Sequence, residues 1–270
     1  MQKDMVSIII PTYNRGYIIE RAIQSILCQT YEAFELLIVD DGSTDDTEDV
    51  VSKIPDERIR YIKCEKNEGP SAARNEGVRQ SRYSYIAFHD SDDEWVADKL
   101  EKQMKVLKEA DADTGMVYCS YQTDDGRVFP LDCFSQEVRQ GNIFPHLLRA
   151  NMVGTPTMLL RKECFVKVGG FCENLRCLED YEFVLRFAHE YKIAYIDEHL
   201  LQVHKSENSV NYRMNDYFPV QLHIINLWKR EMLQYGLLEA AINNLLDQAA
   251  KYGVESQVAV HLKSILDFEV

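Results

Sequence analysis

The sequence predicts an α/β fold built on a mostly parallel central sheet. Short apolar runs rich in β-branched residues recur along the first ninety residues. Segments with apolar residues at helical spacing lie between these runs, and polar turn residues separate the two kinds of segment. Strands that alternate with helices in this way favour parallel pairing through right-handed crossovers.

The elements of the first half follow in order along the chain. The predicted strands cover residues 6–10, 34–39, 59–62 and 85–88. Pro11 is expected to end the first strand, because proline has no N–H to donate to a ladder. The predicted helices cover residues 17–28, the segment carrying Val50 and Val51, the segment opened by Gly69, and a segment that begins near Trp95.

The second half changes character after about residue 110. Residues 115–121, 158–160 and 200–203 are predicted strands, and Asp124-Asp125-Gly126 is a predicted hairpin turn. Gly169-Gly170-Phe171 predicts a flexible loop, since glycine adopts backbone angles that other residues resist. From Met214 onward the spacing of apolar residues is helical, and these helices are expected to pack on the core or on a second copy of the chain.

Composition restricts the classes of partner. The chain has 270 residues, 46% of them hydrophobic, and its formal charge is 30 − 44 = −14, which repels nucleic acid. No apolar stretch approaches the roughly 20 residues of a membrane span, and no secretory signal precedes the first strand. Seven cysteines show no zinc-type spacing and are expected to be free thiols. We therefore expect a cytoplasmic protein, with peripheral contact at the inner face of the membrane left open.

Asp90-Ser91-Asp92 is the most informative short motif. It follows the apolar run 85–88, where an unpaired desolvated carboxylate would be costly. Two such carboxylates suit a hard divalent cation that keeps open positions for substrate phosphates. The alternative is a polar turn that caps the helix expected near Trp95.

Other polar residues follow neighbouring strands. Residues 12–15 come after the first strand and Asp40-Asp41 after the second, while Arg74 lies in the helix opened by Gly69. In a parallel sheet these positions meet outside the carboxyl ends of the strands, where ligands bind. Asp40 either contacts the ligand or stabilises its turn. Neither the Rossmann glycine fingerprint nor a phosphate-binding loop is present.

Five segments together resemble the motif series of family 2 glycosyltransferases, over roughly the first three quarters of the chain. They are VSIIIPTYNR (6–15), LLIVDDGSTD (36–45), GPSAARN (69–75), IAFHDSDDEW (86–95) and LEDY (178–181). The resemblance implies a GT-A fold with a C-terminal helical appendage. It also implies a catalytic domain over residues 1–213, with a nucleotide-binding half of about 1–110 and an acceptor-side half of about 111–213, followed by an extension over 214–270.

The resemblance also implies roles for individual residues. Asp41 would accept a hydrogen bond from uracil N3, Asp92 would be the direct ligand of Mn²⁺ or Mg²⁺, and Asp90 would contact the ribose or the metal. His204, which follows a predicted strand, is a further candidate metal ligand, and a surface histidine is the alternative. The full set of implied nucleotide-binding residues is Pro11, Thr12, Tyr13, Asn14, Asp41, Arg74, Asp90 and Ser91.

The implied reaction is an inverting single displacement. A metal would stabilise the leaving diphosphate, and Asp180 would be the base that deprotonates the acceptor hydroxyl. Glu179 is the second candidate and would position the acceptor. Without the resemblance, both carboxylates can be explained as the acidic first turn of a helix.

The implied function is sugar transfer from a nucleotide sugar, with a UDP-sugar as the expected donor. The acceptor would be a saccharide or a lipid-linked molecule in the synthesis of cell-surface polysaccharide or glycoconjugates. A non-catalytic sugar-nucleotide-binding or assembly module remains an alternative. A sugar-1-phosphate nucleotidyltransferase is a weaker one, since residues 11–14 lack a glycine-rich, arginine-containing loop. A homodimer through the C-terminal helices is also expected.

Overall fold

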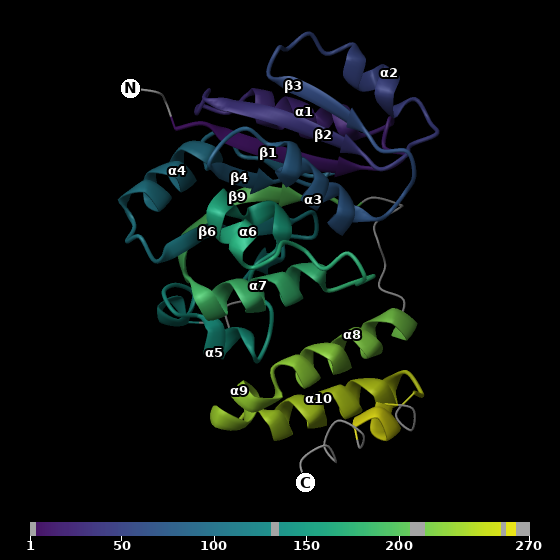
Figure 1. Ribbon diagram of the computed structural model, residues 1–270, viewed down its shortest axis with the longest axis vertical. Coiled ribbons are helices and arrows are strands. Elements are labelled where there is room, and N and C mark those ends of the chain that lie inside the picture. Colours follow the sequence, from purple (N-terminus) through teal and green to yellow (C-terminus); the bar gives the residue numbers. More distant parts are fainter. Residues whose placement is uncertain (1–3, 131–134, 206–213, 255–257, 263–270) are drawn as a thin grey trace.

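The computed structural model describes residues 4–130, 135–205, 214–254 and 258–262. Its strands are β1 (Val6–Thr12), β2 (Phe34–Asp40), β3 (Ile59–Lys63), β4 (Tyr85–Phe88), β5 (Glu94–Trp95), β6 (Thr114–Thr123), β7 (Val128–Phe129), β8 (Leu159–Arg161) and β9 (Lys192–Val203). Across these described residues the nine strands form one sheet in the order β3-β2-β1-β4-β8-β6-β9-β5, with β7 paired to β6. Helices cover both faces (Figure 1).

The first four strands confirm the predicted parallel half. β1 pairs in parallel with β2 and β4, and β2 pairs in parallel with β3. The crossovers contain α1 (Ile19–Leu27), α2 (Thr47–Ser52) and α3 (Pro70–Gln80). Helix α3 lies close to β1, because a Cβ at Gly77 would come within 2.5 Å of the Ile9 side chain.

The second half of the sheet is mixed. β8 pairs antiparallel with both β4 and β6, β9 runs parallel to β6, and β5 pairs antiparallel with β9. The predicted hairpin at residues 124–126 is present, since Thr123 N donates to Arg127 O at 2.9 Å. The parallel arrangement predicted from the alternating pattern therefore applies to β1, β2, β3 and β4.

The first strand was expected to end at Pro11, but in the structure it continues to Thr12. Pro11 lies opposite Val39 of β2, whereas the pairing with β4 stops at Ile9. The side of β1 beyond Ile9 therefore has no ladder partner there, so the missing N–H of proline disrupts no ladder hydrogen bond.

The helix expected near Trp95 is wrong at its start. Trp95 lies in β5 opposite Leu201 of β9, and the helix α4 (Lys99–Glu109) begins four residues later. A strand of two residues is too short to show a periodic pattern in the sequence. Its pairing partner also lies more than a hundred residues away, so no local signal marks it.

Two apolar layers cover the sheet. Ile9, Leu37 and Phe88 belong to one layer, while Ile8, Ile10 and Leu36 belong to the other. This division follows from the alternation of side chains along a strand, and it explains why β1 and β2 are apolar throughout.

The remaining helices are α5 (Phe144–Leu147), α6 (Lys162–Lys167), α7 (Glu179–Glu190), α8 (Met214–Leu227), α9 (Lys229–Gln234) and α10 (Leu238–Lys251).

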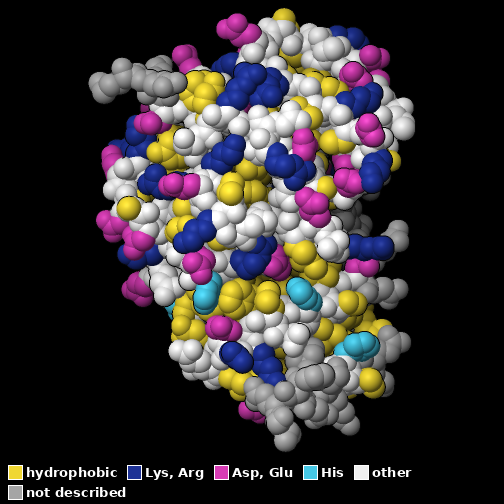
Figure 2. Space-filling model, in the orientation of Figure 1, with side chains coloured by type: hydrophobic (Ala, Val, Ile, Leu, Met, Phe, Trp, Pro, Cys, Tyr) yellow, Lys and Arg dark blue, Asp and Glu magenta, His cyan; other side chains and the backbone are white. Residues whose placement is uncertain are grey.

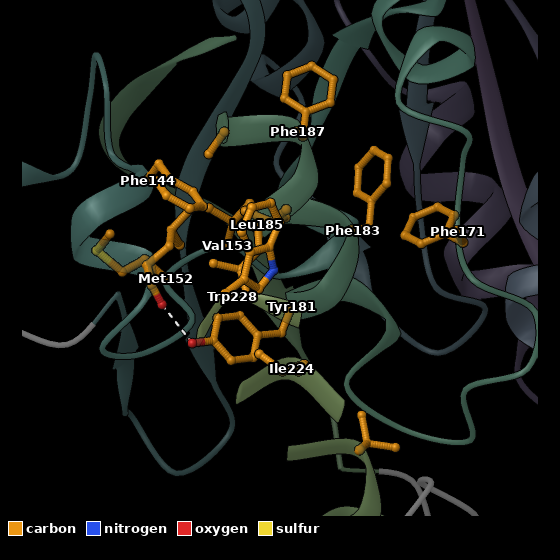
Figure 3. Close-up of a cluster of buried hydrophobic side chains, with 14 of the residues drawn as sticks. Phe144, Met152, Val153, Phe171, Tyr181, Phe183, Leu185, Phe187, Ile224 and Trp228 are labelled. Atoms are coloured by element: carbon orange, nitrogen blue, oxygen red, sulfur yellow. Dashed lines mark hydrogen bonds between the residues drawn. The ribbon is translucent and has the colours of Figure 1, made fainter. Parts of the chain in front are cut away.

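The C-terminal helices share a core with α5 and α7. Trp228 contacts the ring of Phe144 edge-on, with ring centroids 5.0 Å apart, and the Tyr181 hydroxyl donates to Leu147 O at 2.6 Å (Figure 3). The expected helical character after Met214 is confirmed for the described residues, and the domain boundary at 213 stays a prediction. In the part of the chain described, no helix combines the length and apolarity that crossing a bilayer requires.

Figure 2 shows how side chains are distributed on one face of the molecule. Hydrophobic side chains gather in its lower half, around the junction with the C-terminal helices, whereas acidic and basic side chains are interspersed over the upper half. The six described cysteines are free, as expected.

Candidate active site

Two loops at the carboxyl ends of β1 and β2 are fastened together. Asn14 adopts a left-handed backbone conformation with φ 52°. Its N–H donates to Ser43 Oγ at 2.8 Å, and its Oδ1 accepts from Thr44 N at 2.9 Å. Asn14 is one of the implied nucleotide-binding residues. In the structure its backbone N–H and its side-chain amide connect the loops that follow β1 and β2.

Asp40 and Asp41 are both buried but have different partners. Asp40 accepts from Ser43 N at 2.8 Å and from the Tyr61 hydroxyl, as its turn-stabilising alternative predicted. Asp41 accepts from Glu68 N at 2.9 Å and Gly69 N at 2.7 Å. Burial raises the pKa of the Asp41 carboxyl, and these two backbone N–H groups partly offset that rise. The loop before α3 is thereby held against the end of β2.

The other implied nucleotide-binding residues lie along the same rim. Thr12 is buried, and its Oγ1 has no hydrogen-bond partner in the described part of the chain. Pro11 is half-buried and Ser91 is buried, whereas Tyr13 is 45% exposed. Tyr13 is therefore the one of these side chains best placed to meet a ligand from solvent.

Arg74 joins the two ends of the candidate site. This buried guanidinium in α3 donates from Nη2 to Asp90 Oδ1 at 2.8 Å and from Nη1 to Glu179 Oε1 at 3.2 Å. Burial alone would lower the pKa of Arg74, but the charges of Asp90 and Glu179 outweigh burial and raise it. Three segments that are far apart in sequence thus meet at one permanently charged group.

The acidic motif after β4 contains carboxylates in three environments. Asp90 is bound by Arg74, and Asp92, whose side chain is 17% exposed, lies 3.9 Å from Arg15 Nη2. Asp93 is buried, and its Oδ1 accepts from His204 N at 3.1 Å. Burial first, and then the neighbouring Asp90 and Asp92, raise the pKa of Asp93 to about 8. The motif therefore contains a buried carboxyl group, Asp93, beside two further acidic side chains.

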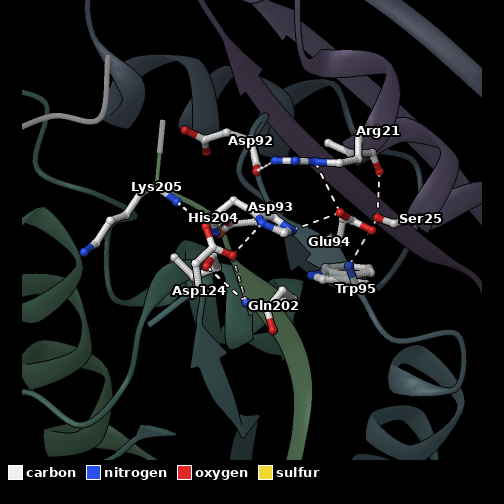
Figure 4. Close-up of polar contacts among 12 residues, drawn as sticks. Arg21, Ser25, Asp92, Asp93, Glu94, Trp95, Asp124, Gln202, His204 and Lys205 are labelled. Carbon is white, nitrogen blue, oxygen red and sulfur yellow. Dashed lines mark hydrogen bonds and ion pairs between the residues drawn. The ribbon is translucent and has the colours of Figure 1, made fainter. Parts of the chain in front are cut away.

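His204 is connected to carboxylates next to the acidic motif (Figure 4). Its Nε2 lies 2.9 Å from Glu94 Oε1, and its Nδ1 lies 2.8 Å from Asp124 Oδ1. Arg21 Nε lies 3.3 Å from the same Glu94 carboxylate. Lys205 follows His204, and residues 206–209 lie outside the described part of the chain.

The donor set at the acidic motif suits a hard divalent cation that is shared with a diphosphate. Among the described residues, no three His, Cys, Asp or Glu side chains come close enough to hold a metal by themselves. Mg²⁺ sites commonly combine one or two carboxylates with substrate phosphates. Asp92 fits that arrangement, and so does Asp90, because Arg74 binds only its Oδ1. Both ring nitrogens of His204 face carboxylates, so a metal would have to displace one of these contacts.

Glu179 and Asp180 begin helix α7, directly after a strained residue. Leu178 has φ 55°, which is unfavourable for a branched side chain and is typical of functional positions. Asp180 Oδ1 accepts from Tyr181 N at 2.7 Å, and its Oδ2 accepts from Asn151 Nδ2 at 3.2 Å. Burial and the adjacent Glu179 raise the pKa of Asp180 to about 7. A carboxylate with that pKa can exchange a proton near neutral pH.

The glycine loop before α7 is anchored, contrary to the flexible loop expected. Asn75 Nδ2 donates to Phe171 O at 2.9 Å, and Phe171 N donates back to Asn75 Oδ1 at 3.0 Å. Gly170 has φ 70°, and a Cβ there would lie 2.8 Å from Asn75 Oδ1. Glycine is needed here for close approach, and the buried Phe171 ring fixes the loop.

The structure brings most of the predicted residues to one rim. Arg74 connects Asp90 to the end of α7, whereas His204 lies with Glu94 and Asp124 beside the motif. Sequence reasoning did not identify Arg21 or Glu94, or that Asn151 contacts Asp180. No local pattern marks these residues, because each contact joins segments at least 29 residues apart or depends on a two-residue strand.

Comparison with known proteins gives consistent matches. A model of Glycosyl transferase family 2 matches residues 7–165. An uncharacterized glycosyltransferase of Rickettsia felis is 35% identical over 249 residues, which cover 89% of this chain and 41% of that protein. Another from Haemophilus influenzae is 30% identical over 92% of this chain and 88% of that one. The putative teichuronic acid biosynthesis glycosyltransferase TuaG of Bacillus subtilis is 36% identical over 60% of this chain and 64% of that one.

Solved structures support the fold. S. aureus TarS 1-349 in complex with UDP-GlcNAc has a TM-score of 0.68 at 24% identity, covering 83% of this chain and 66% of that one. The mannosyltransferase PcManGT from Pyrobaculum calidifontis, in complex with GDP-Man and Mn2+, has a TM-score of 0.66 at 20% identity, covering 98% and 76%. The chain spans about two fifths of the Rickettsia felis relative. With the family model matching more than half of its length, the chain belongs to glycosyl transferase family 2 and has the GT-A fold.

Proposed function

We propose that this chain transfers a sugar from a nucleoside diphosphate sugar, with UDP as the nucleotide, to an acceptor hydroxyl, with inversion at the anomeric carbon. The contact that carries the proposal is the double ion pair of Arg74. It places Asp90 of the acidic motif and Glu179 beside the candidate base within one site, although Arg74 and Glu179 are 105 residues apart.

The donor would lie along the rim formed by residues 11–14, Asp41 and Arg74. Two backbone N–H groups hold the two Asp41 oxygens in place, and the remaining lone pairs would accept a hydrogen bond from a base N–H. The choice of a uridine nucleotide is supported by the UDP-GlcNAc complex of TarS, and the GDP-Man complex of PcManGT supports guanosine as the competing choice.

Departure of the nucleoside diphosphate creates negative charge that the rim must stabilise. Asp92, with Asp90, would hold Mn²⁺ or Mg²⁺, which when bound supplies Lewis-acid stabilisation of the diphosphate. Arg74 is always charged and lies beside Asp90, so it adds a fixed positive charge at this end of the site. His204 remains a candidate ligand that would first have to leave Glu94 or Asp124.

Asp180 would remove the proton from the acceptor hydroxyl. Its pKa of about 7 leaves a substantial deprotonated fraction at neutral pH, while its basicity is far greater than that of an ordinary carboxylate. Asn151 and Tyr181 N hold its two oxygens in place. Glu179, which is bound to Arg74, would keep Arg74 oriented and position the acceptor.

The biological role proposed is synthesis of a cell-surface polysaccharide or glycoconjugate, with a saccharide or lipid-linked acceptor. The name of TuaG, which refers to teichuronic acid biosynthesis, supports this context. The cytoplasmic location, the membrane contact and the homodimer remain predictions.

The test is release of nucleoside diphosphate by the purified chain with Mn²⁺ and a panel of UDP-, GDP- and dTDP-sugars. We expect turnover with at least one UDP-sugar. Binding of UDP-sugars without turnover, whichever acceptor is added, would favour the alternative of a non-catalytic sugar-nucleotide-binding or assembly module. Release of inorganic pyrophosphate from a sugar 1-phosphate and nucleoside triphosphate would favour the nucleotidyltransferase.

A further inference from the structure

A cavity of about 280 Å³ lies between the start of α7 and the C-terminal helices. Its lining comes from the segment after α5, from Leu178 and Tyr181, and from α8, α9 and α10. Figure 3 shows Tyr181 and Ile224 side by side at this junction. The donor rim contributes no residue to this lining.

The cavity begins beside the candidate base. Asn151 lines it and also donates to Asp180 Oδ2 at 3.2 Å. Leu178, whose backbone is held at φ 55°, lines it two residues before Asp180. A molecule in the cavity would therefore contact Asn151, which is itself hydrogen-bonded to the Asp180 carboxylate.

The chemistry of the lining favours a polyhydroxyl ligand. Leu178, Ile224 and Leu245 supply apolar surface, and the ring of Tyr181 adds an aromatic face. Four carboxamides, those of Asn151, Gln221, Asn244 and Gln248, supply polar groups, and Arg149 adds a guanidinium group. An amide both donates and accepts, as a hydroxyl does, whereas a phosphate or carboxylate ligand would be matched by donors alone.

These amides are only partly engaged by the protein. Gln221 Nε2 donates to Tyr217 Oη at 3.2 Å, and Gln248 Nε2 donates to Asn244 Oδ1 at 3.1 Å. Within the described residues, these contacts leave the carbonyl oxygens of both glutamines and the nitrogen of Asn244 for a ligand. Among the described lining residues there is no Asp or Glu, and Arg149 is the one charged side chain.

We propose that this cavity binds the acceptor, and that the group bound is a sugar residue. The sugar would place one apolar face on Tyr181 and its neighbours and its hydroxyls on the amides of α8 and α10. One hydroxyl at the mouth would reach Asp180 past Asn151. This inference rests on the proposed function for its catalytic meaning, and it gives the C-terminal helices a role in selecting the acceptor.

The experiment compares neighbouring amides on α10. Asn244 and Asn243 are both exposed, but only Asn244 lines the cavity, so Asn244→Ala and Asn243→Ala form a matched pair. Ala241→Trp fills the cavity from the same helix. The probes are methyl glycosides of glucose, galactose, mannose and N-acetylglucosamine. Their binding to the full chain is followed by saturation-transfer NMR without donor, and transfer from UDP-sugars is measured against donor hydrolysis.

We expect at least one glycoside to bind the unmodified chain, and Ala241→Trp to abolish that binding. Asn244→Ala should weaken binding about tenfold and lower the ratio of transfer to hydrolysis equally, while Asn243→Ala changes neither. Failure of every glycoside to bind the unmodified chain overturns the proposal, as do equal effects of the two Asn variants. Absent turnover with glycoside binding still sensitive to Ala241→Trp would contradict the proposed function and leave the cavity assignment standing.

Discussion

Replacement of Arg74 by methionine tests whether the two ends of the site are joined as the structure has them. The variant keeps an unbranched apolar stem of similar reach but removes the charge that Asp90 and Glu179 share at 2.8 and 3.2 Å. Two unit charges about 4 Å apart attract by about 4 kcal/mol at an effective dielectric constant of about 20. The two carboxylates would then repel each other without a counter-ion.

The expected loss of stability is smaller than for a fully buried pair. Removal of one partner from a buried ion pair costs about 3–5 kcal/mol. The side chains of Asp90 and Glu179 keep 30% and 19% exposure, so water replaces part of the lost interaction. We therefore expect the free energy of unfolding to fall by about 2–3 kcal/mol for Arg74→Met.

The assay is equilibrium unfolding in urea, with Arg79→Met as the control on the same helix. Arg79 is 61% exposed and pairs with Glu76 at 2.7 Å, so its loss should change the free energy of unfolding by less than about 0.5 kcal/mol. A change below about 1 kcal/mol for Arg74→Met, or equal changes for the two variants, would refute the reasoning. Because Arg74 also lowers the pKa of Asp180, the variant should shift the rise of activity with pH upward.

Three further predictions concern pH and metal. Since the pKa of Asp180 is about 7, kcat/KM should rise about tenfold per pH unit below 7 and level off above it; a flat profile from pH 5 to 8 would exclude Asp180 as the base. The raised pKa of Asp93 means that the folded state holds its proton more tightly than the unfolded chain, so stability is lost as pH rises toward about 8. Asp93→Asn, measured in EDTA, should therefore raise the free energy of unfolding by more than about 1 kcal/mol at pH 8.5 and by much less at pH 4.5. The same increase at both pH values in urea unfolding would contradict this. Finally, UDP should raise the melting temperature with Mn²⁺ present, and EDTA or Asp92→Asn should remove most of that rise; full retention would show that the metal is not held there.

The sequence predicts the first four strands well, because the patterns that indicate them are local. The strand Tyr85–Phe88 has the predicted bounds, and the polar residues after β1, β2 and β4 meet at one rim because the three strands are parallel. That geometry follows from topology alone, without knowledge of any single side-chain contact.

The rest depends on contacts between distant segments. Nothing near Trp95 indicates that it pairs with Leu201, and nothing near Gly170 indicates that Asn75 will lie against it. Gly169 and Gly170 predict a flexible loop because glycine adopts backbone angles that other residues resist. Close packing of the backbone against another residue also requires glycine, and the sequence does not distinguish the two cases. The place of His204 between Glu94 and Asp124 likewise depends on β9 lying beside β5 and β6.

The cavity beside α7 has the same origin. Its lining combines residues from four separate helices with the segment after α5, and the helical pattern after Met214 predicted packing without indicating a site. A sequence with no local motif in that region can therefore still form a cavity, once the C-terminal helices pack against α7.

The central claim is that Asp180 deprotonates the acceptor hydroxyl that attacks a donor held at the rim, and turnover by Asp180→Asn tests it most directly. The substitution keeps the size and the hydrogen-bonding oxygen of the side chain but removes its basicity. With Mn²⁺ and a UDP-sugar, we predict that release of UDP falls at least a thousandfold while UDP binding, measured by calorimetry, stays within threefold of the unmodified chain. Turnover by Asp180→Asn at the rate of the unmodified chain would contradict the account.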